Sequence, residues 1–598
     1  MKKQKLLRQS VKLFFKNWGA YVTLVIVLNL IISAILVPLM EYSTSLILQY
    51  NGVPYISYTN VGWLLTTKPV AVLELLALLV ILFALVFWQF AFLVSGIDNI
   101  SRHHNQTFWQ IAGHAVSQMA HLRFGSFLFF TIYFILVLPF SNVYLSSPLL
   151  SKVAIPTFIL ETVTKNAWLE ILLAAVAILV LYIGIRLTLV LPLMILKRQR
   201  GFEAAGNSWA MTRHRTWGYM WRLMMLGVIS LASTTLLSVG LYFLQTYLDH
   251  QSSGIAFTGA VINMGLLVIW QRLIASFSLV VFMLMLILAI RDDNVAQIKT
   301  PAKLPSKRKW GRRFIAASLI VIFLLSEVIY NAQYLQGALL NQPLTISHRG
   351  VDDGNGVQNT IPALNRTSRE HPNFVEMDIH ETKDHQFVVM HDENLANLAG
   401  VNAAPYQLTL QQMTSMKVHE NGYTAHIASF DQYLRAAERD HQRLLVEIKT
   451  TSHDSPNMLQ LFIHRYERRL LHDHDQIHSL DYHVISGLKK HAPKLFVSYI
   501  LPYNFSFPET KANAYTMEET TLNSQFVSEA HRRNQWVYAW TVDDSDDMTK
   551  MLFLNVDGII TDNLSELQAT IKSTFNHPSY AQRLLIYSNE LQNESPTN

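Results

Sequence analysis

The chain has 598 residues, of which 51% are hydrophobic and only 15% are charged, whereas a typical soluble domain is roughly 25% charged. Its length exceeds that of one ordinary domain, and its composition is unusual for a soluble protein. The absence of cysteine excludes disulfides, thiolate zinc sites and a cysteine nucleophile. The net charge of +6 becomes informative only when the positive residues are placed along the chain.

Long apolar runs recur in the first part of the chain. About 20 apolar residues cross the hydrocarbon core of a bilayer, so these runs predict membrane-spanning helices. We expect an all-α membrane domain over residues 1–332 with about seven spans, at roughly 20–40, 70–97, 125–146, 168–196, 218–246, 262–290 and 313–332. The first run is too long for a cleavable signal peptide and lacks a small-residue cleavage site, so no such peptide is expected.

Lysine and arginine are concentrated in alternate loops. The rich segments are 1–19, 197–215 and 303–313, and the poor segments are 41–69, 147–167 and 247–261. Cytoplasmic loops carry the excess of positive residues. The sequence therefore predicts a cytoplasmic N-terminus and, with an odd number of spans, an extracytoplasmic C-terminal domain in a multi-pass protein of the cell membrane.

Two segments outside the spans are expected to form amphipathic helices at the cytoplasmic membrane surface. They are residues 99–124, with Phe108 and Trp109 as candidate anchors, and residues 202–217. Aromatic side chains on one face of such a helix insert at the lipid boundary.

Arg186 and Arg272 lie within predicted spans four and six. Ionisable side chains inside a membrane usually face a cavity, the bundle interior or a partner. One interpretation is a lipid-headgroup or polyanion site. The alternative is that they pair with Glu74 or Glu170, or lie nearer a membrane surface than the span boundaries suggest.

Residues 344–575 alternate between short apolar runs and helical segments. The strand candidates are Leu344–Ser347, Phe374–Ile379, Phe387–Met390, Leu444–Ile448, Gln476–Leu480, Leu495–Ile500, Val537–Thr541 and Gly558–Thr561. Helices are expected between them, for example at Ala363–Arg369, Phe430–Asp440, Tyr482–His491 and Asn523–Arg533. This pattern fits an α/β TIM barrel, (β/α)₈. An open doubly wound sheet is the alternative, but no glycine-rich nucleotide motif follows the first strand. Residues 576–598 form a polar tail with no assigned role.

Carboxylate side chains lie on two of these predicted strands. Glu376 and Asp378 are two residues apart on one strand, so their side chains share a face. Two carboxylates held together repel each other unless a cation lies between them. Glu447 ends a later strand and can supply a third carboxylate. Oxygen ligands favour a hard divalent ion, so the sequence predicts a site for Ca²⁺ or Mg²⁺.

Histidine and basic residues follow predicted strands: His348 and Arg349 follow Leu344–Ser347, His391 follows Phe387–Met390, and Lys449 follows Leu444–Ile448. His348 and His391 are candidates for a general acid and a general base, because imidazole titrates near neutral pH. Arg349 and Lys449 can contact an anionic substrate. Together with a metal ion, these groups predict hydrolysis of a phosphodiester.

The motifs of this domain resemble those of the glycerophosphodiester phosphodiesterase family in order and spacing, over nearly all of residues 344–567. They are His348-Arg349-Gly350, Gln358-Asn359-Thr360, Glu376-x-Asp378, Thr382-Lys383-Asp384, Val388-Val389-x-His391-Asp392, Glu447-Ile448-Lys449, Val537 to Val542 and Val556 to Asp562. The N-terminal half is similar in layout to the multi-span region of membrane-bound bacterial members.

This resemblance implies a TIM barrel that cleaves glycerophosphodiesters to sn-glycerol 3-phosphate and an alcohol. It also implies roles for the matching residues. The implied roles are metal binding by Glu376, Asp378 and Glu447, acid–base catalysis by His348 and His391, phosphate contact by Arg349 and Lys449, and a pocket position near the glycerol moiety for Trp540. An ordinary barrel-core position for Trp540 is the alternative.

The chain departs from the family pattern at three places. Gln358 replaces the usual glutamate before Asn-Thr, His385 replaces the usual glycine after Thr-Lys-Asp, and Ala396–Leu398 replace a common Arg and Thr. None removes a predicted ligand, so the departures bear on substrate preference and turn geometry.

The sequence thus predicts a membrane-anchored, metal-dependent phosphodiesterase facing the outside. The expected partners are membrane lipids and a glycerophosphodiester or polyglycerolphosphate substrate of lipid-headgroup or lipoteichoic-acid type, with no nucleic acid. A different possibility is a membrane protein that binds or translocates a lipid or polymer, with the barrel as a binding module. The sequence does not separate attack by water from attack by the substrate's own glycerol 2-hydroxyl.

Overall fold

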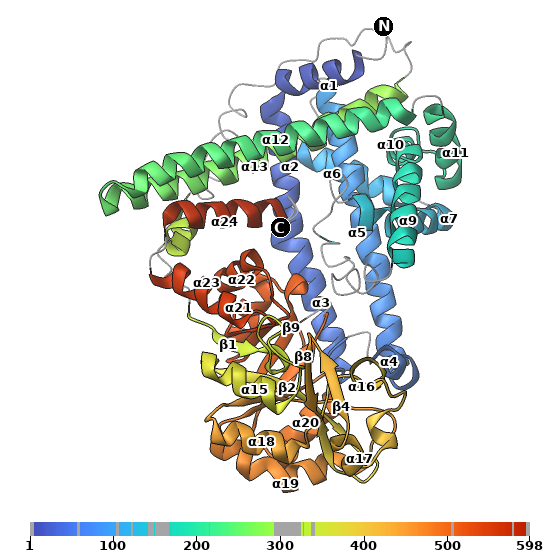
Figure 1. Cartoon of the computed structure of the whole chain (residues 1–598). Helices are drawn as coiled ribbons and strands as arrows, with labels where there is room; N and C mark the ends of the chain where they lie inside the picture. The colour runs from blue at the N-terminus through green and yellow to red at the C-terminus, as the bar shows by residue number, and fades with distance from the viewer. Residues whose placement is uncertain are drawn as a thin grey trace. The chain divides into compact units, whose positions relative to one another are not determined.

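The computed structural model of the chain describes residues 5–56, 60–102, 107–120, 123–141, 149, 167–213, 216–291, 325–326, 328–335, 341–503, 507–576 and 579–593. The chain divides into two compact units (Figure 1). The first comprises Met1–Gly52, Gly62–Gln336 and Ser579–Asn598. The second comprises Val53–Val61 and Gly337–Pro578.

The first unit is helical throughout its described residues. Its helices are α1 (Lys5–Lys16), α2 (Trp18–Ile31), η1 (Ile32–Leu36), α3 (Val37–Tyr50), α4 (Val61–Thr67), α5 (Pro69–Ser101), α6 (Phe108–Ala120), α7 (Phe124–Ser141), α9 (Ala167–Arg186), α10 (Val190–Leu196), α11 (Gly201–Thr212), α12 (Thr216–Asp249), α13 (Ser253–Ile290) and α24 (Tyr580–Asn593). The π-helical turn η1 directly precedes Pro38, whose ring nitrogen has no hydrogen to donate to the preceding turn.

Among the residues that the structure describes, five helical segments are long and apolar enough to cross a membrane, and they coincide with predicted spans. They are Trp18–Tyr50, Pro69–Ser101, Ala167–Leu196, Thr216–Asp249 and Ser253–Ile290. A shorter apolar helix, Phe124–Phe134, matches the start of the predicted span at 125–146. The predicted span at 313–332 lies mostly outside the described residues. This part of the chain is a membrane domain, whereas its orientation and number of passes stay predictions.

Polar side chains within the long helices bond to one another. On α12, Gln245 donates to the carbonyl of Ala256 at 2.9 Å and accepts from Asn263 of α13 at 2.8 Å. Such bonds link apolar helices in the absence of water.

The polar tail also joins this unit, because α24 packs against α12 and α13, with Ser588 and Ser238 hydroxyls 2.6 Å apart.

Arg186 is buried and bonds to α11. Its guanidinium donates to the Trp209 carbonyl at 2.6 Å and lies 4.2 Å from the centre of the Trp209 ring. Glu74, a partner considered from the sequence, instead accepts from Asn51 at 2.8 Å. Arg272 is half-buried. A lipid site at Arg186 and Arg272 stays a prediction.

The second unit contains a closed barrel of eight parallel strands surrounded by helices (Figure 1). The strands are β1 (Leu344–Ser347), β2 (Phe374–Glu381), β6 (Leu444–Ile448), β7 (Gln476–Ser479), β8 (Phe496–Leu501), β9 (Ala514–Glu518), β10 (Trp536–Trp540) and β11 (Gly558–Thr561). β1 pairs with both β11 and β2, which closes the ring. The predicted TIM barrel is therefore confirmed.

Two strand assignments differ from the sequence analysis. The predicted strand at Phe387–Met390 exists as β3 (Phe387–Val389), but it pairs antiparallel with the C-terminal end of β2 and lies outside the ring. The eighth ring strand is β9, Ala-Tyr-Thr-Met-Glu, which the sequence analysis did not identify because it has no run of branched apolar residues. A separate hairpin is formed by β4 (Lys417–Glu420) and β5 (Tyr423–His426).

Helices cover the outside of the ring. They are α15 (Ile361–Thr367), α18 (Phe430–Arg439), α19 (Met458–Asp473), α20 (Tyr482–His491), α21 (Ser524–Arg532), α22 (Ser545–Phe553) and α23 (Leu564–Asn576). Two short helices, α16 (Ala396–Ala399) and α17 (Leu410–Thr414), pack against β4 and β3 instead. A capping box starts α18, where the Ser429 hydroxyl accepts from the Gln432 amide. Phe430, Phe462 and Tyr466 of α18 and α19 fill the space against the strands.

The strand register places one polar layer inside the barrel. Asp378 of β2 is level with Glu447 of β6, which is level with His478 of β7. Level residues on neighbouring strands share a face, and all three side chains are buried. The fold therefore brings together side chains that lie up to a hundred residues apart in the chain.

The second unit also contains a short segment from between α3 and α5. Tyr55 packs its ring against Tyr482 and Tyr499, with ring centres 5.3 and 5.1 Å away. The Pro54 carbonyl accepts from the Glu509 amide at 2.8 Å. Residues 53–56 thus attach to the barrel beside the C-terminal ends of β7 and β8.

Candidate active site

The turn after β1 is tightly wound. It is the short helix η4 (His348–Gly350), in which Arg349 and Gly350 have φ of 52° and 68°. A Cβ on Gly350 would lie 2.8 Å from the Tyr433 hydroxyl, so only glycine fits this position. The turn points the Arg349 amide at Glu376, whose carboxylate accepts its hydrogen at 2.8 Å. The His-Arg-Gly motif therefore links β1 to the carboxylate of β2.

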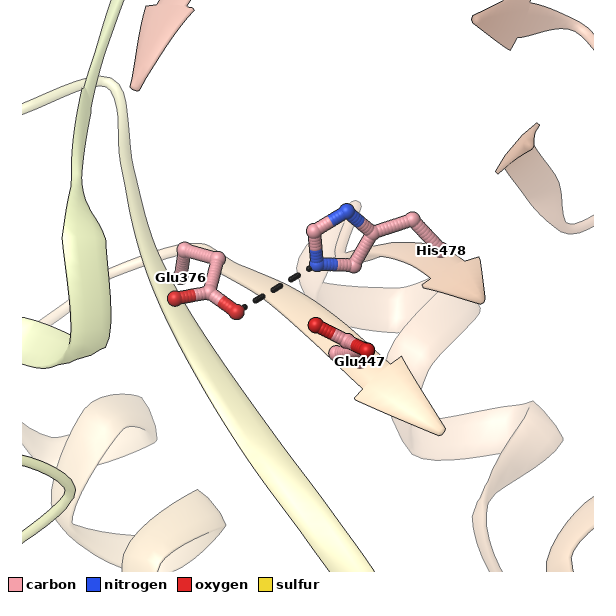
Figure 2. A group of neighbouring side chains, drawn as sticks. All are labelled: Glu376, Glu447 and His478. Atoms are coloured by element: carbon pink, nitrogen blue, oxygen red, sulfur yellow. Dashed lines mark ion pairs between the residues drawn. The ribbon is translucent and has the colours of Figure 1, made fainter. Parts of the chain in front are cut away.

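Glu376, Glu447 and His478 form a compact buried group. One ligand atom from each lies within 4.8 Å of those of the others. Figure 2 shows the imidazole of His478 facing the two carboxylates, with Nε2 3.4 Å from Glu376 Oε1. Both ring nitrogens of His478 are buried without a hydrogen-bond partner among the described residues. Because imidazole and carboxylate are common metal ligands, this donor set fits a divalent cation.

Asp378 lies beside this group and has different neighbours. Its Oδ2 accepts from the Asn359 amide at 2.8 Å, and its Oδ1 is 3.1 Å from Lys449 Nζ. Lys449 also lies 2.9 Å from Glu447 Oε1, so its ammonium bridges two carboxylates.

Electrostatics in this cluster are set by burial and by Lys449. Burial acts to raise the pKa of Asp378, but the charges of Lys449, His391 and Arg349 outweigh it, so the pKa is lowered. Burial, with the charges of Asp378 and Glu376, raises the pKa of Glu447. Burial opposes the charge on Lys449, yet the two carboxylates raise its pKa. An added cation would stabilise the ionised form of Glu447.

His348 is oriented by Asp562 at the end of β11. Its Nδ1 donates to Asp562 Oδ1 at 2.9 Å, which leaves Nε2 as the nitrogen that faces away from Asp562. Burial and the Arg349 charge act to lower the pKa of His348, but the hydrogen bond and the charges of Asp562 and Glu376 raise it overall. The protonated form of His348 is therefore favoured.

The pKa of His391 is shifted in the opposite direction. The residue follows β3, and its Nδ1 lies 2.9 Å from Asp392 Oδ1, while His380 Nε2 lies 3.1 Å from its carbonyl oxygen. Burial lowers the pKa of His391, and the charges of Lys449 and Arg349 act in the same direction. The neutral form of His391 is therefore favoured. The two imidazoles differ in the way that a general acid and a general base must differ.

The two halves of the chain each match a family model. Residues 7–329, more than half of the chain, match the membrane domain of glycerophosphoryl diester phosphodiesterase. Residues 348–566 match the glycerophosphoryl diester phosphodiesterase family. The chain belongs to this family. It is a membrane-domain glycerophosphodiester phosphodiesterase, as its sequence motifs predicted.

Individual relatives resemble the barrel half. A glycerophosphodiester phosphodiesterase of Caldanaerobacter subterraneus is 26% identical over 231 residues, which are 37% of this chain and 94% of that protein. The human lysophospholipase D GDPD1 is 46% identical over 57 residues, 10% of this chain and 18% of that protein.

Two solved structures resemble the same half. That of a glycerophosphodiester phosphodiesterase from Parabacteroides distasonis is 25% identical, covers 39% of this chain and 98% of its own, and has a TM-score of 0.35. An Oleispira antarctica phosphodiesterase in complex with the product sn-glycerol-3-phosphate is 18% identical over 40% of this chain and 98% of its own, also with a TM-score of 0.35.

Two of the three departures from the family pattern have local explanations in this phosphodiesterase. Gln358 accepts from the Arg349 guanidinium at 2.8 Å and donates to Glu420 of β4 at 2.6 Å. The hairpin thus supplies a carboxylate next to the position where the family usually has glutamate. His385 adopts φ of 55°, the left-handed region that glycine favours, and its Nδ1 lies 3.1 Å from Glu381.

The structure brings most predicted site residues into one region. Arg349 and Lys449 contact Gln358 and the carboxylates as described. Trp540 ends β10 half-buried, and its indole N–H has no hydrogen-bond partner within the described parts of the chain. The individual roles of these residues stay predictions.

Sequence reasoning missed several residues of this site. His478 lies on a predicted strand, but only the β6–β7 register shows that it neighbours Glu447. Asp562 was recognised as part of a motif without its contact to His348, and Asn359 without its bond to Asp378. For Asp562 a signal existed, because it directly follows the last barrel strand, where catalytic groups gather.

Proposed function

We propose that the chain is a metal-dependent enzyme that hydrolyses glycerophosphodiesters at the outer face of a membrane, releasing sn-glycerol 3-phosphate and an alcohol. The observation that carries the proposal is the buried cluster of carboxylates with Arg349 and Lys449, beside two histidines that each lie 2.9 Å from a carboxylate oxygen. Such a cluster suits an anionic substrate whose charge grows during the reaction.

We assign the divalent ion to Glu376 and Glu447, with Asp378 or His478 as the next ligand. Three carboxylates favour Ca²⁺ or Mg²⁺, while the unpartnered ring nitrogens of His478 support its participation. When bound, such an ion supplies positive charge to the phosphoryl oxygens.

Side chains of the protein bind the phosphate and transfer the protons. Arg349 and Lys449 hold the non-bridging phosphate oxygens. Neutral His391 removes the proton from the attacking hydroxyl, either of water or of the substrate's glycerol C2. A new P–O bond forms while the bond to the leaving alcohol breaks, and protonated His348 gives its proton to the departing oxygen. Attack by the glycerol hydroxyl yields a cyclic phosphodiester, which water opens in a second step to sn-glycerol 3-phosphate.

The extracytoplasmic location is supported by two observations. The lysine- and arginine-rich loops alternate along the chain. Residues Val53–Val61 from the poor loop 41–69 belong to the barrel unit, as expected when both lie on one side of the membrane. The proposed substrates are therefore lipid headgroups, deacylated phospholipids or polyglycerolphosphate polymers such as lipoteichoic acid.

Product analysis tests the reaction and its metal. The purified full-length protein is incubated with glycerophosphoglycerol, glycerophosphocholine or lipoteichoic acid, after chelation and after addition of Ca²⁺ or Mg²⁺. We expect sn-glycerol 3-phosphate only when a divalent ion is restored. Undiminished turnover after exhaustive chelation would remove the metal from the proposal, and the absence of sn-glycerol 3-phosphate with every substrate would refute the reaction.

Calorimetric titration of each metal into Asp378→Asn and His478→Gln variants tests which residue is a ligand. The variant of the true ligand should bind at least about 10-fold more weakly.

Protease treatment of intact cells tests the location: cleavage within residues 344–593 is expected, and protection of these residues would place the barrel inside.

A further inference from the structure

We propose that the membrane unit contains a second anion site, which binds the phosphate group of an anionic phospholipid or of a small phosphate ester. The site is a cavity of about 170 Å³, far larger than the ~10–15 Å³ needed for one water molecule. It is lined by Phe87, Gln118, Arg123, Ser126, Met194, Arg198, Gln199 and Arg200. These residues come from α5, α6, α7 and α10, and from the segments that precede α7 and α11. The site is separate from the catalytic cluster, so it does not depend on the proposed reaction.

Three arginines give the cavity its charge. Arg123, Arg198 and Arg200 are exposed and have no carboxylate partner among the described residues. Among the described residues, no aspartate or glutamate lines the cavity. Glu203 is close in sequence, but its carboxylate faces the Arg200 amide at 3.4 Å and caps the start of α11. Guanidinium groups bind phosphate oxygens in pairs, so three around one cavity form a phosphate-binding set.

Two amide side chains carry unused hydrogen-bonding capacity at the same place. Oε1 of Gln118 and of Gln199 is buried without a hydrogen-bond partner within the described residues. Such atoms are costly to leave unpaired. A ligand with hydroxyl groups beside its phosphate, such as a glycerol headgroup, would satisfy them.

The local backbone holds the arginines in position. Arg198 has φ of 54°, which turns the chain between α10 and α11. Gly201 then begins α11 in contact with α7, where its amide donates to the Ser126 hydroxyl at 3.1 Å. A Cβ at Gly201 would lie 2.9 Å from Phe129 Cδ1, so glycine permits this approach. The N-terminal end of α11 adds its dipole to the positive side of the cavity.

The apolar part of the lining favours a lipid as the source of the phosphate. Phe87 and Met194 lie on helices of the membrane unit, and the arginines belong to segments that the charge pattern assigns to the cytoplasmic side. Basic pockets between membrane helices on that side bind anionic headgroups. The same phosphate chemistry would also accept a soluble ester.

Ligand-dependent stability of the full-length protein tests the site. Delipidated protein is mixed with phosphatidylglycerol or phosphatidylcholine in mixed micelles, or with inorganic phosphate or sn-glycerol 3-phosphate, and its thermal unfolding midpoint is measured. The variants are the double substitution Arg198→Gln with Arg200→Gln and the single substitution Arg198→Gln, which removes one exposed side chain. Arg213→Gln, which removes an exposed charge from the end of α11 outside the cavity, is the matched control.

We expect phosphatidylglycerol, and not phosphatidylcholine, to raise the midpoint, with an apparent affinity at least about 10-fold weaker in the double variant and unchanged in Arg213→Gln. Stabilisation by inorganic phosphate or sn-glycerol 3-phosphate that depends on the same arginines would also support the site and identify a soluble ligand. Equal responses of the wild type and both cavity variants, or no response to any of these probes, would overturn the proposal.

Discussion

The two units of this protein differ in how much of their apolar surface they leave exposed. In the barrel, every residue of β2 is buried, and apolar side chains fill the space between strands and helices. In the membrane unit, only 6% of the most apolar stretch of Ala167–Leu196 is buried, and side chains such as Ile171 and Ile178 are exposed. A lipid bilayer accepts such a surface, whereas water does not.

The two units also differ in where their charged side chains lie. The barrel gathers carboxylates, histidines and Lys449 into one interior cluster, where each alters the proton affinity of the others. In the membrane unit, Arg186 is buried against a backbone carbonyl and a ring, Arg272 lies within α13, and Arg198 and Arg200 lie between α10 and α11. We propose that the barrel cleaves the phosphodiester bond, whereas the membrane unit only binds an anion.

The largest effect should come from removing the carboxylates that we assign to the metal. Glu376→Gln and Glu447→Gln should each lower kcat at least about 1,000-fold, because charge stabilisation of roughly 4 kcal/mol is lost. Release of sn-glycerol 3-phosphate from glycerophosphoglycerol measures this. Glu566→Gln, which changes an exposed carboxylate of α23, is the control. A variant at Glu376 that kept a tenth of the wild-type rate would contradict the assignment.

Loss of either histidine should have the next largest effect. His348→Asn and His391→Asn should lower kcat by about 10²–10⁴, because a positioned proton donor or acceptor contributes that much. His483→Asn, which changes a histidine on α20 outside the site, serves as the comparison. If both histidine variants turned over substrate normally, proton transfer would have to be assigned to other groups.

The pH dependence of the wild-type enzyme should show a broad optimum around neutral pH. His391 must be neutral to act as a base, and its pKa is lowered, so activity should persist below the usual imidazole pKa of about 6.5. His348 must be protonated to act as an acid, and its pKa is raised, so activity should also persist above that value. A narrow optimum bounded by two limbs near pH 6.5 would exclude this division of roles.

Replacing the buried carboxyl of Asp475 should have a smaller effect, which concerns the stability of the barrel and not its activity. Burial raises the pKa of Asp475 from 3.8 to about 7, and its Oδ2 lacks a partner within the described residues. A raised carboxyl pKa stabilises the folded state at low pH, and this stabilisation is lost as the pH rises from about 4 to 7. Asp475→Asn, which can still accept from the Leu444 amide, should therefore be more stable than the wild type at pH 8 by up to about 4 kcal/mol.

Thermal unfolding of the two proteins across pH checks this expectation. The difference should be large at pH 8 and should vanish near pH 4, and a constant difference at every pH would show that folding does not change the pKa of Asp475. Glu566→Gln should leave the pH dependence of unfolding unchanged.

The smallest predicted effect concerns the segment that joins the barrel from the loop after α3. Tyr55→Ala removes a ring held between Tyr482 and Tyr499, which should cost about 1–3 kcal/mol of local stability. Hydrogen exchange of the Glu509 amide, which donates to Pro54, should become faster. Tyr50→Ala, at an exposed position, is the control, and unaltered exchange in Tyr55→Ala would show that the contact contributes nothing.

Much of the architecture follows from local sequence patterns. Apolar runs of span length predicted the long helices, and short runs predicted seven of the eight ring strands. His348, His391 and Glu447 were found because each ends a strand or lies near its end, where barrels place reactive groups. Glu376 was found because it shares a strand face with Asp378. These features depend on residues close together in the chain, so the sequence was sufficient to predict them.

Other features required the folded chain. β3 has the composition of a ring strand, but a tight turn after Glu381 folds it back on β2, and no local pattern distinguishes the two outcomes. The ring position of β9 follows from pairing with β8 and β10. Likewise, the attachment of residues 53–56 to the barrel and of α24 to α12 and α13 depends on partners hundreds of residues away.

The sequence alone determined that this protein combines a membrane domain with a phosphodiesterase barrel, and which strand ends carry its reactive groups. Only the tertiary structure decided which of those groups are neighbours. It placed His478 beside Glu376 and Glu447, and it placed Asp378 beside Lys449 and Asn359. The physical reason is that strand order and register are fixed by closing the ring, and ring closure is a property of the whole barrel.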